Sequence, residues 1–268
     1  MTVVPILLYH SVSSDPAAWI SRFAVSPAEF ERQLDLIVER GASTLTVSAF
    51  ADALEHDRQA LPERPVLITF DDGFADFHEH ALPALHERGL AATLFVTTGF
   101  VGRRVGGEDA AGERMLDWSQ LAEVREAGIE IGGHSHSHAQ LDAVSRVRAG
   151  EEIGRCKLLL AEGLGVDIST FAYPHGYSSP TVRRLVAEAG YRSACGVKNE
   201  LSSTEDDRFC LARLTVRVTT PTALVASWLA AEGAPPARPR ERLRTRAWRL
   251  YRRGRVALGL ASAVDLGP

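Results

Sequence analysis

Short apolar runs alternate with stretches of helical periodicity along most of this 268-residue chain. The runs have the length of buried strands, and the stretches between them repeat apolar residues every three or four positions, as amphipathic helices do. This alternation predicts parallel strands joined by crossover helices, which is an α/β fold. The expected strands cover residues 3–9, 44–47, 66–70, 92–96, 129–131, 170–173, 191–195 and 214–218, and the expected helices cover 27–40, 49–55, 77–88, 119–127, 146–163, 181–189 and 222–231.

The start of the first expected helix carries the clearest local signal. Ser26 and Glu29 form the pattern of a capping box, and Pro27 stands at the first helical position, where no backbone N–H is needed. Apolar residues then recur at helical spacing until Gly41, which is typical of a helix end. We therefore expect an amphipathic helix between these residues.

Two adjacent acids, Asp71 and Asp72, directly follow the expected strand 66–70. Because Gly73 comes next, one explanation is ordinary turn chemistry, with each aspartate bonding to nearby backbone. Adjacent carboxylates repel each other, however, unless a positive group lies near them. The alternative is that the strand delivers both acids to a cation.

Three histidines, His134, His136 and His138, follow the expected strand 129–131 in the same way. The carboxyl ends of parallel strands in a barrel lie at one face, so the acids and imidazoles should meet there. If the segment is helical, His134 and His138 share a face, and if it is extended, His136 joins them. One carboxylate and two imidazoles leave coordination positions open, as a catalytic metal requires. The sequence therefore predicts a metallohydrolase.

Three segments carry a more specific signal: ITFDDG at 68–73, GHSHSH at 133–138 and FAYPHG at 171–176. In this order and spacing they resemble the first three motifs of the polysaccharide deacetylases, the NodB-homology domain of carbohydrate esterase family four. The likeness spans roughly residues 3–230. It implies a distorted (β/α) barrel, with a catalytic domain over residues 1–232 and a Pro/Arg-rich linker and basic tail over 233–268.

The resemblance also implies a cofactor and a reaction. Members of this family bind one divalent metal, usually zinc, and remove the N-acetyl group of an amino sugar. By motif position, Asp71 is the general base, and Asp72, His134 and His138 are the metal ligands. The backbone N–H of His175 takes the position that holds the tetrahedral oxyanion. The same ligand types also accept iron, cobalt or nickel.

Four residues are expected to face the sugar rather than the metal. Tyr173 lies within the third motif and Tyr177 directly follows it, and each either lines the sugar subsite or packs into the core. Pro174 lies between them, and His136 is expected beside the substrate or in solvent. No pattern in the sequence decides among these alternatives.

The chain departs from the family pattern at two points. Ala172 stands where many members carry an arginine that tethers the catalytic aspartate, so another group must orient Asp71, unless the metal and Asp72 suffice. No histidine follows His175, although members commonly supply a late histidine as the general acid. His10, at the end of the first strand, is the leading substitute, and His136 and His175 are the other candidates.

Charge is distributed unevenly along the chain. The net charge is −4, but residues 238–268 carry nine arginines and two acids, a net +7, which leaves −11 for residues 1–237. An acidic body of this kind is a poor nucleic-acid binder. The basic segment has the spacing of an amphipathic helix, which could lie on an anionic membrane surface or a protein partner, or pack back onto the body.

Cysteine use and hydropathy suggest a location. Cys156, Cys195 and Cys210 are widely spaced and odd in number, which argues against a disulfide framework and a thiolate zinc site. The first residues lack a secretory signal pattern, and no run of about eighteen apolar residues occurs. We expect a cytoplasmic protein. The basic tail suggests that it could also attach peripherally to the inner face of the membrane.

The expected function is therefore removal of N-acetyl groups from an amino sugar, polysaccharide or glycoconjugate of the cell envelope or an exopolysaccharide. One alternative is hydrolysis of another linear or cyclic amide, which the two departures favour. A second alternative is a catalytically silent sugar-binding module, which the intact acids and histidines disfavour. A two-histidine, one-carboxylate iron oxygenase fits the ligand count, but the adjacent second acid fits hydrolysis better.

Overall fold

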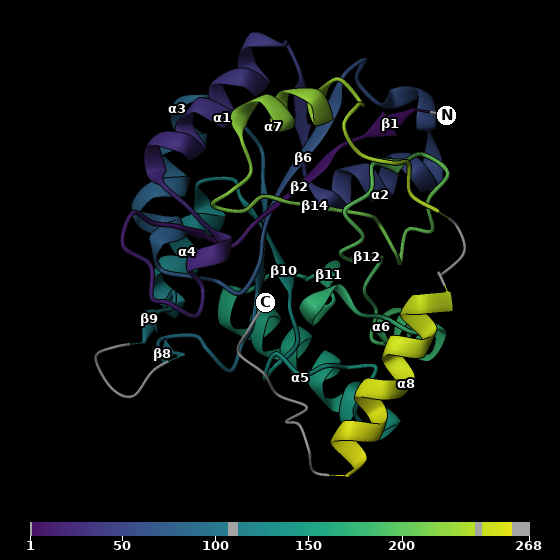
Figure 1. The fold of residues 1–268 in the computed structure, drawn as a ribbon. Helices are drawn as coiled ribbons and strands as arrows, with labels where there is room; N and C mark the ends of the chain where they lie inside the picture. The colour runs from purple at the N-terminus through teal and green to yellow at the C-terminus, as the bar shows by residue number, and fades with distance from the viewer. Residues whose placement is uncertain (1, 107–111, 239–242, 259–268) are drawn as a thin grey trace.

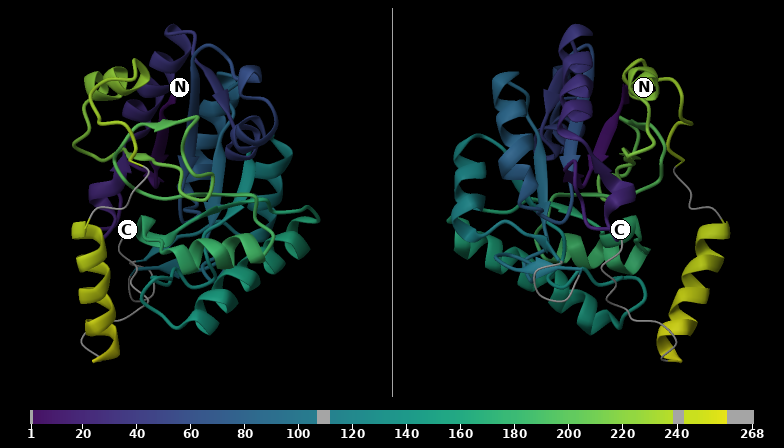
Figure 2. Two further views of the ribbon diagram at one scale, coloured as in Figure 1. Left: turned by 90° about the vertical axis from the view of Figure 1, so that its right-hand side faces the viewer. Right: turned by 60° about the vertical axis from the view of Figure 1, so that its left-hand side comes forward.

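The computed structural model describes residues 2–106, 112–238 and 243–258 (Figure 1). Its centre is one eight-stranded sheet with the order β12-β11-β10-β7-β6-β2-β14, in which β5 also pairs with β6. All of these pairs are parallel, and the sheet curls into the expected distorted barrel (Figure 2). The strands are β2 (Ile6–Tyr9), β5 (Ser43–Leu45), β6 (Pro65–Phe70), β7 (Thr93–Val96), β10 (Glu130–Gly133), β11 (Thr170–Ala172), β12 (Ser193–Cys195) and β14 (Leu214–Thr215).

Helices surround the outside of the sheet, as the two further views in Figure 2 show. The helices that precede the last strand connect successive parallel strands, which is the arrangement that the alternating pattern predicts. The helices are α1 (Pro27–Glu39), α2 (Val47–His56), α3 (Leu82–Glu87), α4 (Trp118–Glu126), α5 (Arg146–Leu164), α6 (Pro180–Glu188), α7 (Thr222–Leu229) and α8 (Leu243–Ala257).

Alternate residues of the strands enter two different cores. Leu7 and Ile68 belong to the larger core, which the outer helices cover. Ile6 and Leu67 belong to a smaller core on the other face, together with Phe50 of α2. The sheet is therefore buried on both faces, which explains why its strands are apolar throughout rather than alternating.

The first helix begins at Pro27 as predicted, although its cap is only half of a capping box. The Ser26 hydroxyl accepts a hydrogen bond from the backbone N–H of Glu29 at 3.3 Å. The Glu29 carboxylate does not return to Ser26 but accepts from Arg32, Gln33 and Thr222 instead. A complete capping box occurs at the start of α4, between Asp117 and Gln120.

Proline explains two differences from the expected elements. The expected strand 3–9 is broken at Pro5 into β1 (Val3–Val4) and β2, because proline has no N–H for the ladder. The expected helix 77–88 starts with a π-helical turn over Phe77–Ala81 before α3, whose second residue is Pro83.

Small antiparallel and parallel pairs complete the fold outside the main sheet. β1 pairs with β13 (Ser202–Ser203), β3 (Ser11–Val12) with β4 (Ala24–Val25), and β8 (Arg104–Val105) with β9 (Glu113–Arg114). The three cysteines are buried free thiols. Within the described parts of the chain, no helix is long and apolar enough to cross a membrane.

Candidate metal centre and active site

Asp72, His134 and His138 converge at the carboxyl ends of β6 and β10. One ligand atom from each lies within 4.8 Å of the others, and all three side chains are buried. The Oδ1 atom of Asp72 lies 3.4 Å from Nε2 of His134 and 3.3 Å from Nε2 of His138. These are the three residues that the family motifs assign to the metal.

The hydrogen bonds at this cluster fit a metal ion. His134 Nδ1 lies 2.8 Å from the carbonyl oxygen of Ala172, which can only accept, so Nδ1 carries the proton and Nε2 presents a lone pair to the cluster. Oδ1 of Asp72 is buried and has no hydrogen-bond partner among the described residues. A divalent cation would satisfy the orphaned oxygen and both imidazole nitrogens together, so the residues present fit this cofactor.

The backbone is held in unusual conformations to bring these ligands together. Asp72, Ser135, His138 and His175 all have φ between 56° and 75°, in the left-handed region that residues with a side chain seldom adopt. Such strain clusters at functional sites, where the surrounding structure maintains it. The histidine segment is therefore neither the helix nor the extended strand that the spacing allowed, and it still presents His134 and His138 together.

His136 lies outside the cluster. Its Nδ1 is 2.9 Å from the Thr98 hydroxyl, and it does not line the catalytic cavity. Its backbone N–H instead donates to the carboxylate of Glu152, which also accepts from the backbone N–H and the hydroxyl of Ser137. Glu152, a buried acid of α5, thus fastens the histidine loop, a role that the sequence patterns did not reveal.

Arg213 orients the second acid, Asp71. Its two terminal nitrogens each donate to one oxygen of Asp71 at 2.7 Å, while its Nε donates to the carbonyl oxygen of Gly196 at 3.0 Å. Both side chains are buried, and Arg213 is fully so. This arginine lies just before β14. It orients Asp71 in place of the arginine that many family members carry at the position of Ala172. Its signal in the sequence is one charge within the apolar run 211–216.

The ion pair keeps Asp71 charged. Burial by itself would raise the pKa of this carboxyl, but Arg213 and His134 outweigh that effect and lower the pKa to about 2. Asp71 is therefore a carboxylate at neutral pH, oriented and free of a proton. Both are conditions for a general base.

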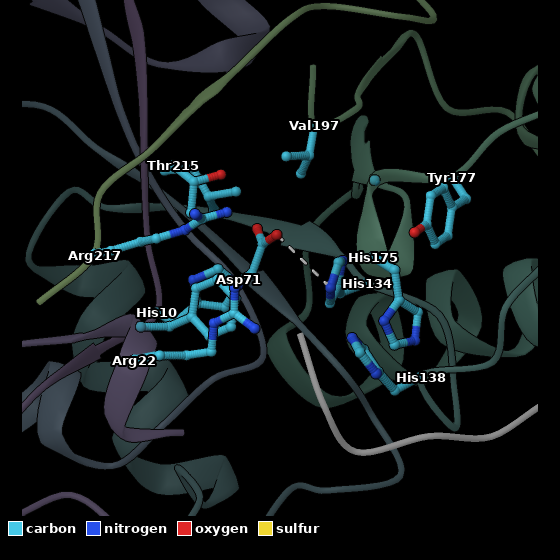
Figure 3. A pocket seen from close by; sticks show the side chains of 13 residues that line it. His10, Arg22, Asp71, His134, His138, His175, Tyr177, Val197, Thr215 and Arg217 are labelled. Atoms are coloured by element: carbon cyan, nitrogen blue, oxygen red, sulfur yellow. Dashed lines mark ion pairs between the residues drawn. The ribbon is translucent and has the colours of Figure 1, made fainter. Parts of the chain in front are cut away.

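A cavity of about 200 Å³ opens beside these residues (Figure 3). Asp71 and His10 stand on one side of it, and His138, His175 and Tyr177 stand on the other. Asp71, the expected base, and His10, the leading candidate for the general acid, thus line the same cavity. His134 and His138, two of the three expected metal ligands, line it as well, and so does Arg217.

His10 and His175 are neutral in this setting. Burial lowers the pKa of His10, and the nearby Asp72 and Asp71 offset only part of that effect. Burial and the imidazoles of His138 and His134 lower the pKa of His175 to about 2. The backbone N–H of His175, which the motif assigns to the oxyanion, donates to no acceptor among the described residues.

The structure separates the residues that were expected at the sugar subsite. Tyr177 lines the cavity, but Tyr173 and Pro174 are buried and do not. Tyr173 is instead a core residue, because its ring packs against Phe171 and its hydroxyl donates to the carbonyl oxygen of Phe209 at 2.9 Å. Of the two alternatives for Tyr173, the structure shows the packed one, and Pro174 does not line the cavity either.

Helix α8, yellow in Figure 1, attaches to the rim of this site. The Trp248 indole N–H donates to the Tyr177 hydroxyl at 3.2 Å, and the guanidinium of Arg252 lies 3.7 Å from the Tyr177 ring centroid. Arg252 also pairs with the buried Asp142 through two hydrogen bonds of 2.9 Å, and Arg249 reaches the same carboxylate. The described part of the basic tail thus packs on the body, and residues 239–242 and 259–268 lie outside the described residues.

Comparison with solved structures shows the same fold in known deacetylases. IcaB from Ammonifex degensii superposes with a TM-score of 0.74 at 28% identity, covering 85% of this chain and 97% of that protein. The Streptococcus pyogenes deacetylase PplD, in complex with acetate, gives a TM-score of 0.73 at 23% identity over 83% of this chain and 96% of that one. The second likeness concerns the fold alone.

Sequence comparison leads to the same group of proteins. The poly-β-1,6-N-acetyl-D-glucosamine N-deacetylase of Staphylococcus aureus is 23% identical over 206 residues, which are 74% of this chain and 69% of that protein. YxkH of Bacillus subtilis is 27% identical over 213 residues, 80% of this chain and 71% of its own. The family model described as polysaccharide deacetylase matches residues 58–194, just over half of the chain. This chain therefore belongs to the polysaccharide deacetylase family, whose members hydrolyse amide bonds other than peptide bonds.

Proposed function

We propose that this protein removes the acetyl group from an N-acetylated amino sugar within a polysaccharide or glycoconjugate, using one divalent metal. The observation that carries the proposal is that the adjacent acids Asp71 and Asp72 have different partners. Arg213 holds Asp71 charged beside the cavity, while Oδ1 of Asp72 faces the Nε2 atoms of His134 and His138. The first acid is placed to move a proton, and the second to hold a metal.

Asp72, His134 and His138 would hold the metal, and we propose zinc, which one carboxylate and two imidazoles suit well. Iron, cobalt and nickel accept the same donors. When bound, the metal would polarise the amide carbonyl and make water more acidic.

Proton transfer is assigned to this chain's own side chains. Asp71 accepts the proton that the attacking water loses as it bonds to the acetyl carbon, and Arg213 keeps the carboxylate aimed at that point. The backbone N–H of His175 donates a hydrogen bond to the carbonyl oxygen as negative charge builds on it. The C–N bond then breaks, the amine gains a proton, and acetate and a free amino sugar are released.

His10 is our candidate for the group that gives the amine its proton. It lines the cavity on the same side as Asp71, and its Nδ1 atom is buried without a partner among the described residues. Because His10 is neutral in the free site, it must first gain the proton that Asp71 takes from the attacking water and then donate that proton to the leaving amine, which restores both groups.

The substrate class follows from the relatives. The Staphylococcus aureus relative is named for the deacetylation of poly-β-1,6-N-acetyl-D-glucosamine, an acetylated amino-sugar polymer. This likeness supports a cell-envelope polysaccharide or exopolysaccharide as the substrate here. A cavity that opens at the molecular surface suits one sugar of a longer chain.

Acetate release from a panel of N-acetylated sugars and oligosaccharides by zinc-reconstituted protein tests this proposal. We expect release from oligosaccharides and one free amine formed for each acetate. If the protein holds one metal and releases no acetate, while it hydrolyses linear or cyclic amides, the alternative hydrolase is correct. If it binds the sugars and hydrolyses nothing, it is a binding module.

For the basic tail we propose peripheral contact with an anionic membrane surface at the cytoplasmic face. Trp248, Leu250 and Tyr251 of α8 are large apolar residues that remain 46%, 69% and 53% exposed, on a helix rich in arginine. Exposed aromatic and basic residues on one helix suit a lipid interface. The full chain should sediment with anionic vesicles and not with neutral ones, and removal of residues 238–268 should abolish this. Unchanged sedimentation would refute the contact.

A further inference from the structure

Two arginines stand over the catalytic cavity on the His10 side. Arg22 belongs to the short helical turn Ser21–Phe23, and Arg217 follows β14. Figure 3 shows both guanidinium groups directed into the cavity, opposite His138 and Tyr177. The proposed chemistry uses neither of them.

Arg22, Arg217 and His10 all lie close to one aromatic ring, that of Phe23. The guanidinium carbons of Arg22 and Arg217 lie 4.7 Å and 5.5 Å from the ring centroid of Phe23, and the His10 ring lies 5.1 Å from it. The backbone N–H of Val218 donates to the carbonyl oxygen of Arg22 at 3.2 Å, which ties the two segments together. The pair is therefore held by packing and backbone contacts.

Neither arginine has an acidic partner within the part of the chain that the structure describes. The contrast with Arg213 is direct, because Arg213 pairs with Asp71. The Nε atom of Arg217 is buried and has no acceptor among the described residues. Asp71 is the one carboxylate among the residues that line the cavity, and its ion pair is with Arg213 rather than with Arg22 or Arg217.

Two like charges that share one ring repel each other unless an anion lies between them or beside them. Guanidinium groups bind carboxylate and phosphate oxygens through short, directional hydrogen bonds. Two guanidinium groups that project into a substrate cavity can therefore bind an anionic group of the substrate.

We propose that Arg22 and Arg217 form an anion subsite, and that the preferred substrate carries a carboxylate or phosphate on the N-acetylated sugar or on its neighbour. The inference deepens the proposed deacetylase function and rests on it. A neutral N-acetylglucosamine polymer would leave both arginines without a partner. The charge of the substrate is therefore the property that this site selects.

Equilibrium binding to the metal-depleted full chain tests the subsite without turnover. The probes are N-acetylmuramic acid, which carries a carboxylate, N-acetylglucosamine 1-phosphate, and neutral N-acetylglucosamine. We expect at least one anionic probe to bind about ten times more tightly than the neutral sugar, with an advantage that shrinks as salt is raised. The better anionic probe identifies the chemistry of the natural group.

Arg22→Gln and Arg217→Gln, made separately, should each remove most of that advantage. Arg184→Gln is the matched control, because Arg184 is an exposed residue of α6 that does not line the cavity. It should keep the full preference. Equal binding of anionic and neutral sugars by the wild-type chain, or an undiminished preference in both cavity variants, would overturn the proposal.

Acetate release by the zinc-loaded protein separates this inference from the proposed function. Release that is faster from anionic than from neutral oligosaccharides, with a lower ratio in Arg217→Gln, supports both. Release at equal rates from the two classes would overturn the anion subsite and leave the deacetylase function standing. No release from either class, with the anionic binding preference intact, would count against the function and support the subsite.

Discussion

Arg213 donates two hydrogen bonds of 2.7 Å to the two oxygens of Asp71, although 142 residues separate them in the chain. The pair is buried, so the charge of each side chain depends on the other. Many family members orient the catalytic aspartate with an arginine in the third motif, but Ala172 of β11 occupies that position here. In this chain the contact to Asp71 comes from Arg213, directly before β14, and not from position 172 in β11.

Replacing Arg213 with lysine should impair the base while keeping a positive charge nearby. Lysine cannot donate two parallel hydrogen bonds to a carboxylate, so Asp71 loses its fixed orientation. We expect kcat to fall by about 10- to 100-fold and the free energy of unfolding to fall by about 2–4 kcal/mol, near the cost of breaking a buried pair. Activity assays and urea unfolding measure these effects. Arg192→Lys, at an exposed ion pair, is the control, and equal effects in the two variants would contradict the account.

Glu152→Gln should weaken metal binding without removing a ligand. The Glu152 carboxylate accepts three hydrogen bonds from His136 and Ser137, and an amide in its place offers one oxygen and one donor group. Groups that orient metal ligands typically contribute 10- to 100-fold in affinity, and we expect a loss of about that size. Competition with a zinc chelator measures it. The adjacent exposed Glu151→Gln should bind zinc as the wild type does, and parity between the two variants would refute the role of Glu152.

Substitution of His10 tests the assignment of the proton donor. His10→Gln should lower kcat by about 100-fold or more, because general acid catalysis commonly contributes 10²–10⁴-fold. The zinc content should stay at the wild-type level, since His10 is not one of the three clustered ligands. His86→Gln, an exposed histidine of α3, serves as the control. If the His10→Gln variant kept the full kcat, the proton donor would be a group other than His10.

A half-buried acid outside the active site, Asp76, should make stability depend on pH. Burial raises the pKa of Asp76 to about 6, although hydrogen bonds from Ser11 and Val12 oppose the shift. Between about pH 4 and pH 6 the folded state therefore holds a proton that the unfolded chain has lost, so stability falls as pH rises through this range and stays low above it.

Asp76→Asn should remove this dependence, because the amide keeps an oxygen for the Ser11 hydroxyl and carries no charge. We expect the variant to be more stable than the wild type at pH 8, by up to about 3 kcal/mol, and to lose that advantage near pH 4. Urea unfolding of the metal-free proteins at several pH values gives the comparison. A stability difference that does not change with pH would show that the charge of Asp76 is not the cause.

The sequence predicted the cluster of Asp72, His134 and His138 because its signals are local. Asp72 and His134 each follow an apolar strand within a few residues, and the carboxyl ends of parallel strands meet at one face of the fold. Neither conclusion needs a long-range contact. The same reasoning predicted the order of strands and helices, whose ends differ from expectation mainly where Pro5 and Pro83 interrupt the backbone hydrogen bonds.

The groups that support the ligands were harder to predict because their partners are distant in the sequence. Glu152 lies on a helix 15 residues beyond the loop that it holds, and as one polar residue among many it has no distinctive pattern. For Tyr173 the sequence left two alternatives open, substrate contact and core packing. A residue at a strand end can face the core as readily as the cavity, and in the structure the Tyr173 ring packs into the core.

The most direct test of the account compares the zinc-loaded wild type with Asp71→Asn, measuring acetate released from N-acetylated oligosaccharides together with the zinc content of both proteins. Asparagine keeps the shape of the side chain and cannot take a proton from water. The account predicts one zinc in each protein and a loss of acetate release of at least about 100-fold in the variant, because Asp71 is the base and not a ligand. Undiminished acetate release by Asp71→Asn, with zinc still bound, would contradict it.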